Sequence, residues 1–259
     1  MIDPTTAPWY DQPLGKLQEI ALFSICVAGK NAKVIAQCLR NLLRSVGLSD
    51  PNPTDPPFEL IKRFDTVPIK QQLNPLDDEF TVRAFLNLRY NQRITLAGLL
   101  HFFGIGCYNL KAKAIHSLID KNLDLETCSV KDLESVYGIG PKTARFFILH
   151  TRRNANVACL DTHILKWLSE LGFNAPKNTP SGNKYLQLEK LILAICKLCS
   201  WKPADLDISI WLRYAKGVRS VYGSKGVPTS DSLLPTREIL KRLIKAEPTL
   251  ENVIAAAGL

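Results

Sequence analysis

Lys142 and Asp161 are the two residues of this 259-residue chain whose types and setting best fit covalent chemistry. Lys142 closes the Gly138–Lys142 turn, which joins two apolar segments whose periodicity predicts helices. Asp161 follows nineteen positions later, where the pattern predicts the start of another helix. A lysine amine can act as a nucleophile, and a nearby carboxylate can accept its proton or stabilise a developing positive charge. The alternatives are a lysine that only binds phosphate and an aspartate that only caps a helix.

The turn before Lys142 is suited to a phosphate group. Glycine allows the main chain to approach a ligand closely, and a helix that begins after such a turn directs free N–H groups at an anion. The pattern Leu-x-x-Val-x-Gly-x-Gly-x-Lys-Thr-Ala over residues 133–144 is typical of a helix–hairpin–helix, which positions DNA through its phosphates. We therefore expect DNA contacts from Gly138, Gly140, Thr143 and Arg145. An ordinary helix–turn–helix connection is the alternative, and residues 103–109 form a weaker version of the same pattern.

The bulk composition favours a polyanionic partner inside a cell. The formal net charge is +9 and the isoelectric point is about 9.2, which favours nucleic acid over a membrane surface. The seven scattered cysteines are typical of reduced, buried thiols, and Cys196 and Cys199 are expected to be core residues of one helix and not metal ligands. We find neither a signal peptide at the N-terminus nor an apolar run long enough to span a membrane, so a soluble, intracellular protein is expected.

The chain is predicted to be all-α. Helices are expected over 14–46 with a break at 29–31, over 58–64, and from 74–79 to about 90. Further helices are expected over 94–103, 111–121, 129–136, 185–200 and 205–216. One more helix follows the Gly138–Lys142 turn and runs to residue 150, and another starts at residue 161. A proline-rich loop covers 47–57 and a linker 217–232, followed by a basic helix over 234–245. We predict a helical domain over 1–220, in two lobes with a ligand cleft between them, and a linker with a C-terminal helix over 221–259.

Residues 101–168 resemble the core of the helix–hairpin–helix DNA glycosylase superfamily, which includes endonuclease III. The segment GIGCYNLKAKAI resembles its GLYNSKA-type segment, SVYGIGPKTA its LPGVGRKTA hairpin, and VACLDTHIL its VDTHI segment, all in the family's order. The resemblance implies that Lys142 attacks C1′ of the target nucleotide and forms a Schiff base, with Asp161 as the family's aspartate. Lysine at this position is typical of members that also cleave the strand. His163 is then expected to face DNA, with a structural histidine as the alternative.

The chain also departs from endonuclease III. The four-cysteine iron–sulfur motif is absent, so no cofactor and no metal are expected, and the chain resembles cluster-free branches such as archaeal 8-oxoguanine glycosylases. In those glycosylases, a C-terminal helix helps to form the pocket for the base. The resemblance therefore implies that Asp207 and Trp211 line the base pocket in this chain. The family residue that fills the space left by the flipped base corresponds to a position near Gly29 or Lys30 in this chain. The leucine that the family inserts into the DNA as a wedge corresponds to Cys107. The 47–90 stretch is longer than in endonuclease III.

The resemblance implies a monomeric DNA glycosylase with AP lyase activity on double-stranded DNA, excising an oxidised base such as 8-oxoguanine or an oxidised pyrimidine. Two alternatives stay open. One is a divergent member that processes hypermodified thymine, for which the insertion and the altered probing residues leave room. The other is a non-catalytic DNA-binding module that keeps the hairpin; the presence of both Lys142 and Asp161 argues against it, since binding alone does not need that pair.

Overall fold

Helices form every regular element in the part of the chain that the structure, a computed structural model, describes: residues 2–46, 56–66, 95–214 and 234–259. These ranges contain one 3-10 helix, η1 (Pro4–Thr6), and twelve α-helices, which confirms the all-α prediction. The helix predicted to end near residue 90, the linker at 217–232, the domain boundary near 220 and most of the proline-rich loop lie outside the described residues. None of the described helices combines the length and apolar character needed to cross a membrane.

The chain divides into two compact units, and we call them the first and the second unit. The first unit comprises residues 1–6 and 12–139, and the second comprises residues 7–11 and 140–259. The division falls between Ile139 and Gly140, within the turn that precedes Lys142. Lys142, Asp161, Asp207 and Trp211 therefore belong to the second unit, and the candidate probing residues near Gly29 and Cys107 belong to the first.

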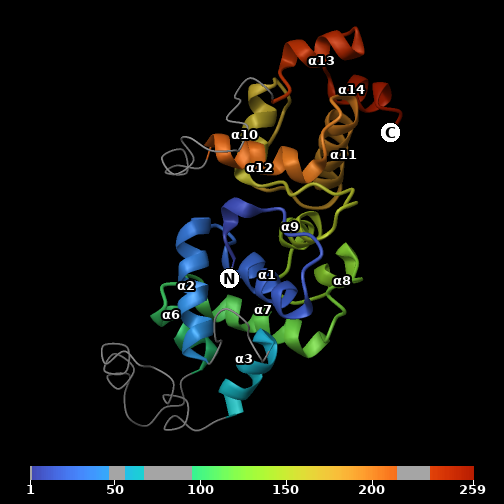
Figure 1. Cartoon of the computed structure of the whole chain (residues 1–259). Coiled ribbons are helices and arrows are strands. Elements are labelled where there is room, and N and C mark those ends of the chain that lie inside the picture. Colours follow the sequence, from blue (N-terminus) through green and yellow to red (C-terminus); the bar gives the residue numbers. More distant parts are fainter. Residues whose placement is uncertain (1, 47–55, 67–94, 215–233) are drawn as a thin grey trace. The chain divides into compact units, whose positions relative to one another are not determined.

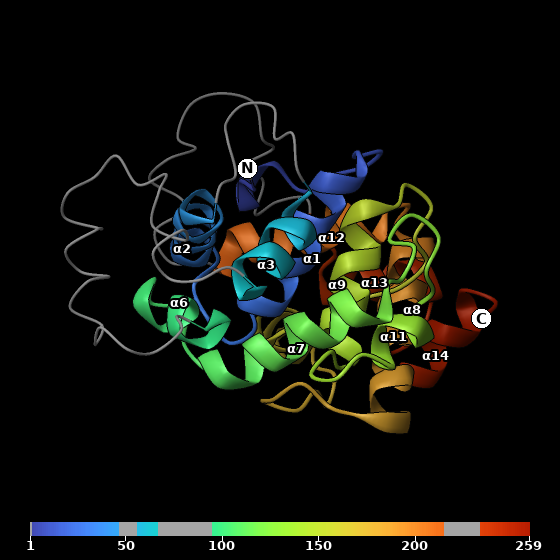
Figure 2. The same cartoon turned by 90° about the horizontal axis from the view of Figure 1, so that it is seen from below.

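The first unit is built around α1 (Leu14–Cys26). This helix packs against α2 (Ala32–Ser45), α3 (Pro57–Thr66) and α7 (Tyr108–Lys121), while α6 (Leu96–Phe102) lies along α7 (Figures 1 and 2). The short α8 (Val130–Glu134) follows. Ile20, Leu22, Leu43 and Leu100 are fully buried, in keeping with the apolar spacing that predicts these helices.

Local signals explain where these helices begin and end. The break predicted at 29–31 is present: Gly29 has a φ of +68°, and the Asn31 side chain caps α2 by accepting from the Val34 N–H at 3.2 Å. The capping box of Ser129 and Asp132 is also present, although α8 ends at Glu134 and not at Val136. Helix α7 begins at Tyr108, three residues before the predicted start.

The second unit contains α9 (Pro141–Thr151), α10 (Thr162–Glu170), α11 (Gly182–Leu198), α12 (Pro203–Tyr214), α13 (Arg237–Ile244) and α14 (Leu250–Ala256). Helix α12 packs against α9, α10 and α11, and α11 lies beside α14 (Figure 1). Trp167, Leu191 and Ile210 are among the fully buried residues of its main core. The predicted basic helix is α13, whereas α14 was not predicted; its first turn is capped by Thr249. Cys196 lies buried in α11 and Cys199 follows it, both as free thiols.

Candidate active site

The turn that precedes Lys142 requires glycine at one of its two glycine positions. Gly138 has a φ of +78°, and a Cβ added there would lie 2.8 Å from the Cβ of Ala114. Gly140 has a φ of −92°, accessible to any residue, and open space where its Cβ would be. Gly140 is instead the N-cap of α9, and Pro141 occupies the first position of that helix. Positive φ is therefore needed at Gly138 alone.

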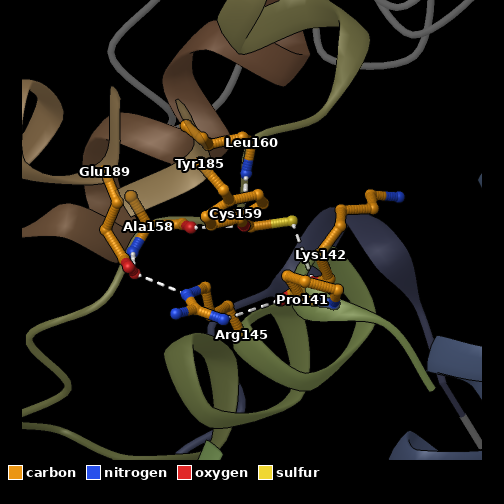
Figure 3. A network of polar contacts seen from close by, with 8 residues as sticks. All are labelled: Pro141, Lys142, Arg145, Ala158, Cys159, Leu160, Tyr185 and Glu189. Carbon is orange, nitrogen blue, oxygen red and sulfur yellow. Dashed lines mark hydrogen bonds and ion pairs between the residues drawn. The ribbon is translucent and has the colours of Figure 1, made fainter. Parts of the chain in front are cut away.

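Lys142 lies in the first turn of α9 and is partly buried. Figure 3 shows its side chain extending away from Arg145 and Glu189. Within the described residues its amine takes part in no ion pair and no hydrogen bond, so the side chain is available for a ligand. A lysine that is not held by an acidic partner can serve as a nucleophile once it loses its proton.

Asp161 is the N-cap of α10, which confirms the predicted helix start. One carboxylate oxygen, Oδ1, accepts hydrogen bonds from the His163 N–H at 2.9 Å and the Ile164 N–H at 2.8 Å. The described residues donate none to Oδ2, so that oxygen can face a ligand while the helix fixes the carboxylate. Burial raises the pKa of Asp161, as does the charge of Asp207, while the hydrogen bond from Ile164 and the charge of Lys142 oppose this.

A buried polar network joins the helix of Lys142 to the segment before Asp161 (Figure 3). The Arg145 guanidinium donates to Glu189 Oε1 at 2.7 Å, and the same oxygen accepts from the Ala158 N–H at 3.0 Å. The Tyr185 hydroxyl donates to the Ala158 carbonyl at 2.9 Å and accepts from the Leu160 N–H at 3.1 Å. These bonds hold α9, α11 and residues 158–160 in one arrangement.

Arg145 has a different place from the DNA contact that the sequence suggested. Its side chain is buried and its guanidinium lies over the Tyr185 ring, 4.7 Å from the centroid, in addition to the ion pair with Glu189. A buried arginine paired in this way supports the structure of the site and does not present its charge to solvent. This role was missed because Glu189 lies 44 positions away, in a helix that the sequence predicts to be mostly apolar.

Cys159 is a second residue of the site that the sequence did not indicate. Its buried thiol donates a weak hydrogen bond to the main-chain oxygen of Lys142, with 3.7 Å between sulfur and oxygen. Burial raises the pKa of Cys159 well above its ordinary value, so the thiol stays protonated. The contact links the residue that carries the amine to the segment that leads into Asp161.

Asp207 lies on α12 beside a buried histidine. The His150 Nε2 atom is 3.0 Å from Asp207 Oδ2, and His150 is fully buried within α9. Trp211 follows one turn later on α12 and is partly buried. His163, on α10, stacks its ring on Tyr214 of α12 with 6.1 Å between centroids. The sequence did not indicate His150 as a site residue, because its partner is 57 positions away.

Of the remaining candidate residues, Thr143 is partly buried on α9 of the second unit, and the others lie in the first unit. Gly29, Lys30 and Cys107 are all exposed. Lys30 lies over Gly106, where an added Cβ would come within 2.8 Å of the lysine Nζ. Cys107 has a φ of +59° and is the N-cap of α7. Lys30 and the start of α7 therefore form one exposed surface.

Among its described residues, the second unit thus combines an amine without an ion-pair partner with a carboxylate that keeps one oxygen available, an arrangement suited to covalent catalysis by lysine. Part of the chain is similar to two curated proteins named 8-oxoguanine DNA glycosylase/AP lyase. The protein from Thermoplasma volcanium is 43% identical over 82 residues, which are 30% of this chain and 37% of that protein. The protein from Thermoplasma acidophilum is 38% identical over 82 residues, with the same shares. The similarity therefore spans little more than a third of either relative. No family model matches the chain, and no solved structure matches it.

Proposed function

We propose that the protein is a DNA glycosylase with AP lyase activity, in which Lys142 is the nucleophile and Asp161 its carboxylate partner. The observation that carries the proposal is the presence of two available groups in one unit. Among the described residues, the Lys142 amine takes part in no ion pair, and Oδ2 of Asp161 accepts no hydrogen bond. The similarity of 82 residues to two proteins named glycosylase/AP lyase supports it.

The reaction that fits these groups proceeds through a covalent intermediate. Lys142 passes a proton to a carboxylate, and the neutral amine attacks C1′ as the bond to the base breaks. The departing base takes up the proton that the carboxylate accepted, so Asp161 is ionised again and stabilises the positive charge that develops on the sugar. Ring opening then gives a Schiff base between Nζ and C1′, and loss of a C2′ proton with departure of the 3′ phosphate cleaves the strand. Both groups come from the chain, so the proposal requires no cofactor.

The proposed substrate is double-stranded DNA that contains an oxidised base or an abasic site, bound by a monomer. The net charge of +9 favours a polyanion, and the N-terminus of α9 offers main-chain N–H groups to a phosphate. Gly138, Gly140, Thr143, His163, Lys30 and Cys107 are the proposed DNA contacts. The names of the two relatives favour 8-oxoguanine over an oxidised pyrimidine. Asp207 and Trp211 are the proposed pocket residues of the second unit.

A borohydride trapping experiment tests this proposal. Duplexes that contain an abasic site, 8-oxoguanine or an oxidised pyrimidine are incubated with the protein, and reduction should produce a covalent complex with the abasic duplex and with the lesion that is excised. Lys142→Ala should abolish the complex, whereas Lys190→Ala, at an exposed lysine of the same unit, should leave it unchanged. Trapping that survives Lys142→Ala would exclude Lys142 as the nucleophile, and salt-sensitive DNA binding without any base release would favour a binding module.

A further inference from the structure

We propose that His150 positions Asp207 as a second carboxylate beside Asp161, and that this neighbour makes Asp161 a better acceptor for the Lys142 proton. The inference rests on the proposed function. Asp207 is predicted from the sequence as a pocket residue, whereas the structure ties it to a buried histidine of the helix that carries Lys142. His150 is accordingly a positioning residue that acts through Asp207.

The environment of His150 leaves one role for its ring. The imidazole is fully buried and packs against the rings of Trp9 and Phe146, whose centroids lie 5.9 Å and 4.7 Å from its own. Its Nδ1 atom has no hydrogen-bond partner among the described residues, while Nε2 lies 3.0 Å from Asp207 Oδ2. Because Nε2 faces a carboxylate, which can only accept, we assign a proton to Nε2, which donates to Asp207.

An unpartnered buried nitrogen costs free energy, on the order of 1–3 kcal/mol for a polar group. A phenylalanine or leucine would fill the same apolar space without that cost. The presence of a histidine at this position therefore points to the bond that it makes through Nε2. That bond fixes which way the Asp207 carboxylate faces.

The helices bring Asp207 to the site. Helix α12 packs against both α9, which begins next to Lys142, and α10, which begins after Asp161. The charges of Lys142, Asp161 and Asp207 all affect the pKa of the buried Cys159 thiol, and the charge of Asp207 raises the pKa of Asp161. The three charged groups are therefore neighbours within the second unit.

The charged and titratable groups around the two carboxylates are few in the described part of the chain. Asp161 faces Lys142 from α9, Asp207 from α12 and His163 from its own helix. Asp207 faces His150 and Asp161, and its charge also acts on the buried thiols of Cys159 and Cys196. Of these neighbours, Asp207 is the one whose negative charge acts on Asp161.

A second carboxylate helps the proton transfer that must precede attack. An ordinary carboxylate is a weak acceptor for the proton of an ammonium group whose pKa is about 10.4. Two neighbouring carboxylates do not ionise independently, so one of them holds a proton more tightly. The proton leaves Nζ of Lys142 and binds Oδ2 of Asp161, which leaves a neutral amine and a neutral carboxyl. Proton transfer is more efficient when the pKa values of the donor and the acceptor lie closer together.

The test is the pH dependence of single-turnover trapping on abasic DNA by the full chain. Asp207→Asn keeps an acceptor for His150 but removes the charge, so the acidic limb of the profile should move to lower pH and the plateau rate should fall by roughly tenfold. Asp205→Asn makes the same charge change at an exposed position of α12 and should leave the profile unchanged. In an Asp161→Asn background, Asp207→Asn should have no further effect on the residual rate.

Two variants of His150 test the positioning role. His150→Gln can still donate to Asp207 and should retain the wild-type profile, whereas His150→Phe cannot and should give the Asp207→Asn profile. A wild-type profile in both Asp207→Asn and His150→Phe overturns this inference alone, as does an Asp207→Asn effect that persists without Asp161. If the wild-type protein forms no trapped complex at all, the proposed function fails and the inference fails with it.

Discussion

Arg145 and Glu189 form a buried ion pair in which the guanidinium Nε lies 2.7 Å from Oε1, and that oxygen also accepts the Ala158 N–H at 3.0 Å. One carboxylate oxygen thereby joins α9, α11 and the segment that leads to Asp161. The relative positions of the Lys142 main chain and Asp161 depend on this structural pair, although neither member of it needs to touch a substrate.

We expect Glu189→Gln to destabilise the protein strongly. The substitution leaves the Arg145 charge buried without a counter-charge, which typically costs about 3–5 kcal/mol. Glu59→Gln is the control, because its pair with Lys62 is exposed, and it should cost less than about 1 kcal/mol. Chemical denaturation at neutral pH measures both. Equal small losses in the two variants would show that the Arg145–Glu189 pair does not contribute as its burial implies.

The contrast between Asp161 and Arg145 shows what the sequence could predict. Asp161 caps a helix through N–H groups two and three positions away, so the local pattern was sufficient. Arg145 stands three residues after Lys142 and was assigned to DNA, because its partner lies in α11, 44 positions away. Helix periodicity reports which face is apolar, but a buried ion pair on that face depends on tertiary packing. His150 and Asp207 were separated in the sequence for the same reason.

The two glycines of the turn should respond differently to the same substitution. Gly138→Ser places a side chain at a φ of +78° and a Cβ 2.8 Å from that of Ala114, so we expect a loss of about 1–2 kcal/mol or more in the free energy of unfolding. Gly140→Ser should be nearly neutral, since serine is a good N-cap and its Cβ meets open space. Thermal melts of the two variants provide the comparison. Similar melting temperatures would contradict the strained turn.

Lys30 provides a prediction about DNA affinity. If its exposed amine neutralises a phosphate, Lys30→Ala should weaken binding to all duplex sequences alike and reduce the slope of log affinity against log salt by about 0.9. Lys62→Ala removes an exposed lysine of the same unit that is paired with Glu59, and it should change the slope less. Fluorescence anisotropy across a salt series measures both slopes. Identical slopes for Lys30→Ala and the wild-type protein would remove Lys30 from the interface.

Asp161→Asn should separate the role of the carboxylate in catalysis from its role as a helix cap. Asparagine caps a helix as well as aspartate does, so the variant should fold and bind DNA while base release slows by about 100-fold or more. An equal loss of DNA affinity and rate would instead indicate that Asp161 serves mainly as a structural cap.

Stability should also respond to pH. Because burial and the Asp207 charge raise the pKa of Asp161, the folded protein binds its proton more tightly than the unfolded chain does. The carboxyl therefore lowers the free energy of unfolding progressively as the pH rises from the unfolded to the folded pKa, and fully above it. Asparagine lacks this titration, so the stability of the variant relative to the wild-type protein should increase as the pH rises above about 3.9, the ordinary pKa of an aspartate. Asp205→Asn controls for the lost charge. If the difference in unfolding free energy between Asp161→Asn and the wild-type protein stays constant with pH, the pKa of Asp161 is the same in the folded and the unfolded chain. The ionised carboxylate would then not lower the stability of the folded protein.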